Sequence, residues 1–236
     1  MQNGTFGPRA GAASVAAGRR GFGRGMLAAV LLVAAAIGWM PAARAADEAP
    51  DALVQRLTTE TLAQVRSDAA IKSGDIAKVM ALVESKIMPN VDFQRMTAST
   101  VGPKWREATP EQKQRLQELF KVLLVRTYAG ALTQVTDQEV VVKPFRGSAD
   151  DKEVLVRTEV RGNASEPIQI DYRLEKTPGV AGGWKIYNLN VLGIWLVDTY
   201  RSQFASEINS KGIDGLIATL ETLNQSKAAG GSGKKG

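Results

Sequence analysis

The sequence of 236 residues contains no histidine. Without histidine it forms no Ser-His-Asp or Cys-His triad and no His-ligated zinc site, and it lacks the usual general base at neutral pH. Carboxylates remain for acid–base work, but Asp198 and Glu207 lie nine positions apart on one predicted helix, which places them on opposite sides of it. No Walker loop is present, and no GxGxxG stands between a strand and a helix. We therefore expect no enzyme, no metal site and no other cofactor.

Cysteine is also absent. This excludes disulfide bonds, and it excludes the lipid-modified cysteine that anchors bacterial lipoproteins. An exported protein of this kind has to be stabilised by core packing alone.

Acidic residues are missing from the first 45 positions, which hold five arginines. An uncharged apolar run at residues 26–40 follows the arginines and is short for a membrane span. Ala43-Arg44-Ala45 then supplies small residues in the A-x-A pattern. This order predicts a secretory signal peptide over residues 1–45, cleaved after Ala45, with export to the periplasm. The alternative is an uncleaved N-terminal anchor.

The sequence pI of about 9.6 depends largely on that leader. The chain has 30 basic and 24 acidic residues, so 25 and 24 remain after residue 45. A nearly neutral chain gives no indication of a nucleic-acid partner.

The first half of the chain after the leader shows apolar residues at helical spacing. Helices are predicted over residues 51–66 and 75–88, with a short helix after Asp92. The longest helix is predicted over residues 109–135. Thr109 serves as its N-cap, Pro110 takes the first helical position, and Gln112 completes a capping box. We expect the other elements to pack on this central helix.

The apolar period changes from 3.6 to 2 after residue 135, which predicts strands at residues 139–145, 152–161, 167–175 and 184–191. The last strand changes phase within itself, and a β-bulge or burial on both faces explains such a change. Short turns join the strands. Helical periodicity returns over residues 194–208 and again after Asp214.

These elements predict an α+β fold, in which a four-stranded antiparallel meander sheet packs against a helical layer with a long central helix. One domain is expected over residues 46–225, and a disordered tail over residues 226–236. Large apolar residues collect on the central helix, on one sheet face and on the helix after the sheet. Periodicity alone leaves two interpretations open for them, a packed core or the lining of a cavity between sheet and helix.

Several motifs resemble those of the MlaC/toluene-tolerance family. They are VDFQRMTASTV at residues 91–101, Trp105-Arg106 with ATPEQKQRL, F-x-x-L-L-x-R-T-Y-A-G-A-L from Phe120, G-W-K-I-Y at residues 183–187 and Y-R-S-Q-F at residues 200–204. The similarity runs from about residue 51 to residue 224, with the motifs in order.

The resemblance implies a soluble periplasmic phospholipid carrier with a lipid cavity between the sheet and the helices. It implies two partners, an inner-membrane ABC transporter complex with an MCE-domain subunit and an outer-membrane lipoprotein–porin complex. Two alternatives stay open: a carrier of another lipid, such as a hopanoid, and a non-lipid adaptor module of the transporter.

With this resemblance, the apolar residues on facing stripes become candidate lipid-binding residues: Phe120, Leu124, Tyr128, Val156, Ile170, Tyr172, Tyr187, Val191, Val197 and Phe204. Arg126 and Arg201 lie in aromatic-rich helical motifs. Because an unpaired buried arginine is costly, each is expected to have a carboxylate or carbonyl partner. They are either structural or contacts for a lipid headgroup or a partner protein.

Overall fold

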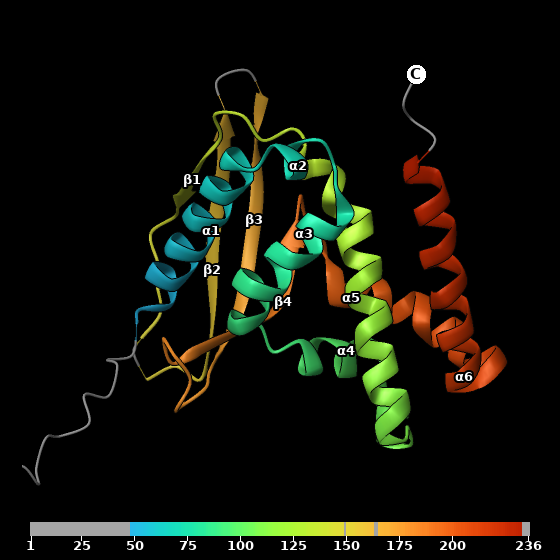
Figure 1. Ribbon diagram of the computed structural model, residues 1–236. Coiled ribbons are helices and arrows are strands. Elements are labelled where there is room, and N and C mark those ends of the chain that lie inside the picture. The colour runs from blue at the N-terminus through green and yellow to red at the C-terminus, as the bar shows by residue number, and fades with distance from the viewer. Residues whose placement is uncertain (1–47, 149, 163–164, 233–236) are drawn as a thin grey trace, which may run out of the picture. The chain divides into compact units, whose positions relative to one another are not determined.

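The computed structural model describes residues 48–148, 150–162 and 165–232. The predicted signal peptide and its cleavage site lie outside these residues. The described chain begins with helices, continues with a sheet and ends with helical segment α6, which bends sharply (Figure 1). The helical elements are α1 (Pro50–Ser67), α2 (Ala69–Lys72), α3 (Ile76–Leu82), the π-helix η1 (Val83–Ile87), the 3-10 helices η2 (Met88–Asn90) and η3 (Gly102–Arg106), α4 (Phe93–Val101), α5 (Pro110–Leu132) and α6 (Leu196–Ser232).

Side-chain caps fix where most of these helices begin. The carboxylates of Asp68, Asp75 and Asp92 accept backbone N–H groups at the starts of α2, α3 and α4. Thr109 and Gln112 form the predicted capping box of α5. Each cap therefore pairs one or two of the free N–H groups in the first turn of its helix.

The sheet has five antiparallel strands in sequential order, four of them predicted: β1 (Glu139–Val142), β2 (Glu153–Gly162), β3 (Ser165–Lys176), β4 (Trp184–Val191) and β5 (Ile194–Trp195). The predicted phase change in β4 is a bulge. Leu174 pairs with Ile186 but Arg173 pairs with Asn188, so Tyr187 is the extra residue. Because of this bulge, Ile186 and Leu189 share one face of the sheet.

That face, called the inner face below, carries Val154, Val156, Tyr172 and Leu174 and packs against α1. Leu53, Val54 and Leu57 of α1 are buried in the same cluster. Apolar residues three and four positions apart form one side of α1, so the helix buries this side and leaves the other in solvent.

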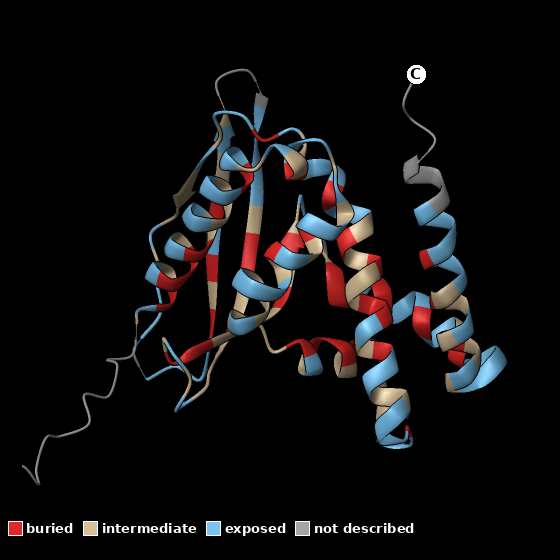
Figure 2. Ribbon diagram, in the orientation of Figure 1, coloured by how far each residue is buried: buried red, intermediate tan, exposed pale blue. Residues whose placement is uncertain are grey.

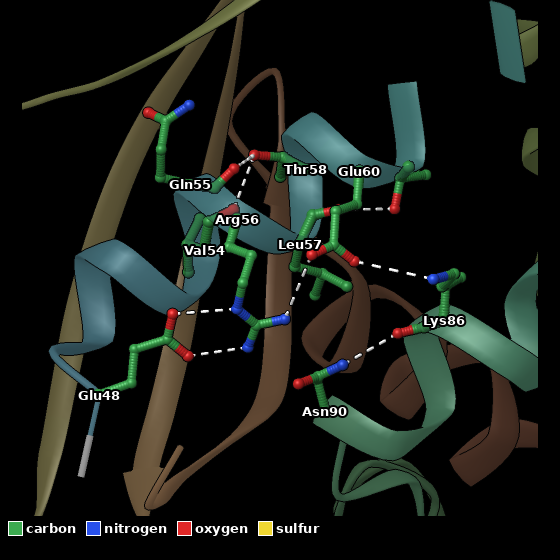
Figure 3. A network of polar contacts seen from close by, with 10 residues as sticks. Glu48, Val54, Gln55, Arg56, Leu57, Thr58, Glu60, Lys86 and Asn90 are labelled. Atoms are coloured by element: carbon green, nitrogen blue, oxygen red, sulfur yellow. Dashed lines mark hydrogen bonds and ion pairs between the residues drawn. The ribbon is translucent and has the colours of Figure 1, made fainter. Parts of the chain in front are cut away.

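The solvent side of α1 is held by polar contacts (Figure 3). Arg56 binds Glu48 with 2.7 Å between Nη2 and Oε2, and it also pairs with Glu60. Glu60 in turn pairs with Lys86 of η1 at 3.8 Å. Exposed ion pairs such as these contribute about 0–1 kcal/mol each, so the apolar side does most of the anchoring of α1.

Two further clusters contain α5. One joins α4, α5 and α6 through Phe93, Leu116, Phe120, Tyr200 and Phe204, among others. The other joins α1, α2, α3 and α5, with Val65, Ile71, Val79, Val125 and Ala129 among its members. The prediction that the other elements pack on the central helix thus holds for the helices. The cluster on the inner face of the sheet, however, contains no residue of α5 among those described.

Two boundaries differ from the sequence-based predictions. Ile194 and Trp195 form strand β5, where a helix start was predicted, because they pair with Val191 and Asn190. The two predicted C-terminal helices are confirmed, because α6 is divided at Gly212, whose φ of 72° breaks the helical conformation. Helix α6 continues to Ser232, where disorder was predicted from residue 226; residues 226–229, Ser-Lys-Ala-Ala, are compatible with a helix.

Candidate functional site

The inner face of the sheet extends beyond the part that α1 covers. Strand register places Val160 opposite Ile168, Ile170 opposite Val191, and Val191 opposite Ile194, so all five side chains share this face. We call this set the open end of the inner face. Val160, Ile170 and Val191 are half-buried, whereas Ile168 is 39% exposed and Ile194 is 55% exposed. Figure 2 shows β3 passing from exposed at its N-terminal end to buried at its middle.

This exposure follows from the way the helices divide their apolar sides. The buried residues of α5 pack on other helices. Those of α1 pack on the part of the inner face that contains Val154, Val156, Tyr172 and Leu174. Val91 is the only described residue that packs against both the sheet cluster and the α4–α5–α6 cluster. Contiguous apolar surface that neighbouring elements cover only in part is typical of a binding site for an apolar ligand.

Three of the predicted lipid-binding residues, Phe120, Val197 and Phe204, lie inside the α4–α5–α6 cluster. The Phe120 ring is 5.1 Å from that of Tyr200 and 5.3 Å from that of Phe204, with both contacts edge-to-face. Such pairs are favourable contacts of a close-packed interior. These three residues therefore belong to a different buried cluster from the sheet candidates Val156 and Tyr172.

The sheet candidates Val156 and Tyr172 are buried opposite each other under α1. Burial raises the pKa of the Tyr172 hydroxyl to about 12, so it stays protonated at neutral pH. Ile170 and Val191 are the two predicted residues that belong to the open end.

Leu124 and Tyr128 lie about one turn apart on the same side of α5. Leu124 is half-buried against the α4–α5–α6 cluster, and Tyr128 is 39% exposed. Burial of the rest of its side chain raises the pKa of Tyr128, and the neighbouring Tyr200 hydroxyl adds to the shift. Ligand contact by either residue stays a prediction.

Tyr187 lies on the outer face, opposite to the other candidates, because the bulge displaces it. Arg95 of α4 stacks over the Tyr187 ring at 3.6 Å, and the Tyr187 hydroxyl donates to Glu153 at 3.0 Å. The same guanidinium binds Glu153 at 2.6 Å and also pairs with Glu175. Arg95 thereby ties α4 to β2, β3 and β4, and Tyr187 belongs to this structural contact.

The hydrogen bonds from Arg95 and Tyr187 hold the pKa of Glu153 below its usual value of 4.5. A lowered folded pKa contributes stability above the unfolded pKa, and this contribution is lost as the pH falls through the folded value. For Glu175 the opposite shift holds, since burial raises its pKa.

Glu153→Gln is therefore expected to lower the free energy of unfolding at pH 7. The loss should be on the order of 0.5–1 kcal/mol, since the side chain is largely exposed and screened. The difference should vanish as the pH falls from 4.5 through the lowered pKa. Urea unfolding across this pH range measures it, with the exposed Glu139→Gln as control. A difference that persists at low pH would contradict the role of the charge.

Both candidate arginines have the carbonyl partner that the sequence analysis predicted. Arg126 donates through Nη1 to the backbone oxygen of Asn224, and Arg201 donates through Nε to that of Ser99 at 2.8 Å. Arg126 also lines a pocket of about 350 Å³ between α5 and the end of α6. Arg201 is exposed. Headgroup or partner contact by either arginine stays a prediction.

Sequence reasoning left Val160, Ile168 and Ile194 out of the candidate set. The first two alternate correctly in their strands, so period 2 could have included them. Ile194 was missed because helical periodicity predicted a helix there, whereas the turn at Leu192 and Gly193 returns it to the sheet.

Comparison with known proteins decides the family. The model of the family described as MlaC protein matches residues 55–222. The chain belongs to the MlaC family. The toluene tolerance protein ttg2D of Pseudomonas putida is 35% identical over 194 residues, which are 81% of this chain and 84% of the relative.

Two further similar proteins carry names that refer to phospholipid. The intermembrane phospholipid transport system binding protein MlaC of Haemophilus influenzae is 21% identical over 177 residues, 75% of this chain and 82% of the relative. The phospholipid-binding protein of Ralstonia solanacearum, solved in complex with a phospholipid, is 45% identical with a TM-score of 0.72. That match covers 75% of this chain and 98% of the solved chain.

The described residues include no helix of sufficient length and hydropathy to span a membrane. Within the same part of the chain, no group of acidic side chains is placed to hold a metal ion.

Proposed function

We propose that this chain is a soluble periplasmic phospholipid carrier and not an enzyme. It would move phospholipid between an inner-membrane ABC transporter complex with an MCE-domain subunit and an outer-membrane lipoprotein–porin complex. The observation that supports this best is the similarity to the phospholipid-bound Ralstonia solanacearum protein over 98% of its length.

The open end of the inner face is the surface of this structure that suits acyl chains. It offers aliphatic side chains from four strands. Val191 and Ile170 would contact the chains from the sheet, and Leu124 and Tyr128 from α5. Buried aromatic residues of the α4–α5–α6 cluster would support this site without touching the lipid.

The energetics suit a carrier that has no energy source of its own. Burying a methylene group contributes about 0.8 kcal/mol, so two chains of roughly 16 carbons contribute on the order of 25 kcal/mol relative to water. A bilayer offers about the same. The carrier has only to bind the acyl chains about as favourably as a bilayer does. The direction of transfer would come from its partners.

Arg126 is the candidate for a polar contact. Its Nε and the side-chain oxygen of Asn224 are buried without a hydrogen-bond partner among the described residues, and both residues line the 350 Å³ pocket. A phosphate oxygen of a headgroup could accept from Arg126 Nε, and a hydroxyl group could donate to the Asn224 side-chain oxygen.

One experiment tests the proposal. The full chain is expressed with its own leader, purified from the periplasmic fraction, weighed by intact mass spectrometry and extracted with organic solvent. We expect a chain that begins at Ala46 and carries about one phospholipid per protein. Full-length protein in the membrane pellet would contradict the export prediction. A hopanoid in the extract would favour the alternative cargo, and a lipid-free extract would favour an adaptor role.

A further inference from the structure

The turn between β4 and β5 has an unfavourable residue at its tip. Val191 pairs with Ile194, so the hairpin loop consists of Leu192 and Gly193 alone. Both have positive φ, 53° and 86°, as a type I′ turn requires. Asparagine and glycine are the residues that adopt this conformation readily, whereas the γ-branched side chain of leucine is strained there. Leu192 is the only non-glycine residue with positive φ in the described chain.

The strained residue is also the most exposed of the large apolar residues that the structure describes. Leu192 is 63% exposed, and Ile194, on the other side of the turn, is 55% exposed. The turn itself is well anchored, because the Leu192 N–H donates to the Gln169 carbonyl at 3.1 Å and the Gly193 N–H donates to the Asn190 side chain at 2.8 Å. A rigid turn thus holds two aliphatic side chains out in water.

The surroundings of this tip resemble those of a membrane-interface anchor. Trp195 is half-buried and stacks under the Arg173 guanidinium at 4.0 Å. Tryptophan and arginine beside aliphatic side chains are typical of the boundary between headgroups and acyl chains. Asp198 is the exposed acidic residue that follows on α6, so the attraction has to come from the apolar tip and not from net charge.

We propose that Leu192 and Ile194 form an apolar tip that inserts into the surface of a phospholipid bilayer. The inference rests on the proposed carrier function and adds the place where lipid enters. Ile194 lies on the inner face beside Val191, so an acyl chain leaving the bilayer at the tip would meet the open end without crossing polar surface. A two-residue tip is far smaller than the roughly 1,000 Å² of a specific protein–protein interface, which favours a bilayer over a protein pocket as its target.

Leu192→Asn tests the proposal, because asparagine suits the turn and removes the apolar side chain. The melting temperature should stay the same or rise by a few degrees. Transfer of a fluorescent phospholipid between phosphatidylethanolamine/phosphatidylglycerol vesicles should fall about tenfold, and co-sedimentation with these vesicles should fall in parallel. Leu223→Asn, which removes another exposed leucine from α6, should leave transfer and vesicle binding unchanged.

The native chain has no cysteine, so Leu192→Cys accepts one fluorophore without background labelling. Its emission should shift to the blue with vesicles, and that of a label at Leu223→Cys should not. Equal transfer and vesicle binding by Leu192→Asn and the native chain would overturn the bilayer tip. The lipid content of the native protein distinguishes this failure from a failure of the carrier proposal. If native protein contains bound phospholipid, the carrier proposal stands; if it contains no lipid, the carrier proposal is wrong.

Discussion

Val191→Asp is expected to yield folded protein that purifies without lipid. Val191 is half-buried at the open end of the inner face, next to Ile170. A carboxylate there faces solvent when the site is empty, but bound acyl chains would desolvate it at a cost of several kcal/mol. A cost of this size lowers lipid occupancy by more than about a hundredfold. Mass spectrometry of the organic extract measures occupancy, and circular dichroism verifies the fold.

The matched control is Leu155→Asp, which places the same charge at a half-buried position on the outer face of the sheet. It should retain lipid. If Val191→Asp keeps its lipid, or if both variants lose it equally, the open end of the inner face is not the lipid site.

Phe120→Ala is expected to cost about 3–5 kcal/mol of the free energy of unfolding, because it leaves a cavity in a packed cluster. Phe120 is fully buried and contacts the rings of Phe93, Tyr200 and Phe204. Urea unfolding measures the loss. Protein that remains folded should still carry lipid, since the structure places Phe120 in the core and away from the open end.

Tyr128→Ala on the same helix is the comparison, and it should cost about 1 kcal/mol or less because Tyr128 is 39% exposed. A variant of Phe120 with unchanged stability but no lipid would show that this ring lines the ligand site. The packed-core interpretation of the aromatic cluster would then be wrong.

Local signals in the sequence predicted most of the elements. The capping box of Thr109 and Gln112 sets the start of α5, and strict alternation sets β2 and β3. The phase change in β4 indicated either a bulge or burial on both faces, and the strand register shows a bulge. These features depend on residues close together in the chain, so their physical causes are visible in the sequence.

The candidate site was predicted less completely, since an apolar residue on a stripe packs against whichever element the fold brings to it. Phe120 and Val156 look equivalent by periodicity, yet one packs among helices and the other under α1. Tyr187 was predicted to be a lipid-binding residue, but the bulge places it on the outer face beside Arg95.

The sequence by itself determined the caps, the strand alternation, the lack of histidine and cysteine, and the motifs of the family. Only the tertiary structure decided which apolar side chains remain uncovered. That choice depends on strand register and on which helix packs on the sheet, and both arise from contacts between residues far apart in the chain. Val156 shows this most clearly, because strand alternation sets only the face on which it lies, whereas α1, from a distant part of the chain, decides that it is buried.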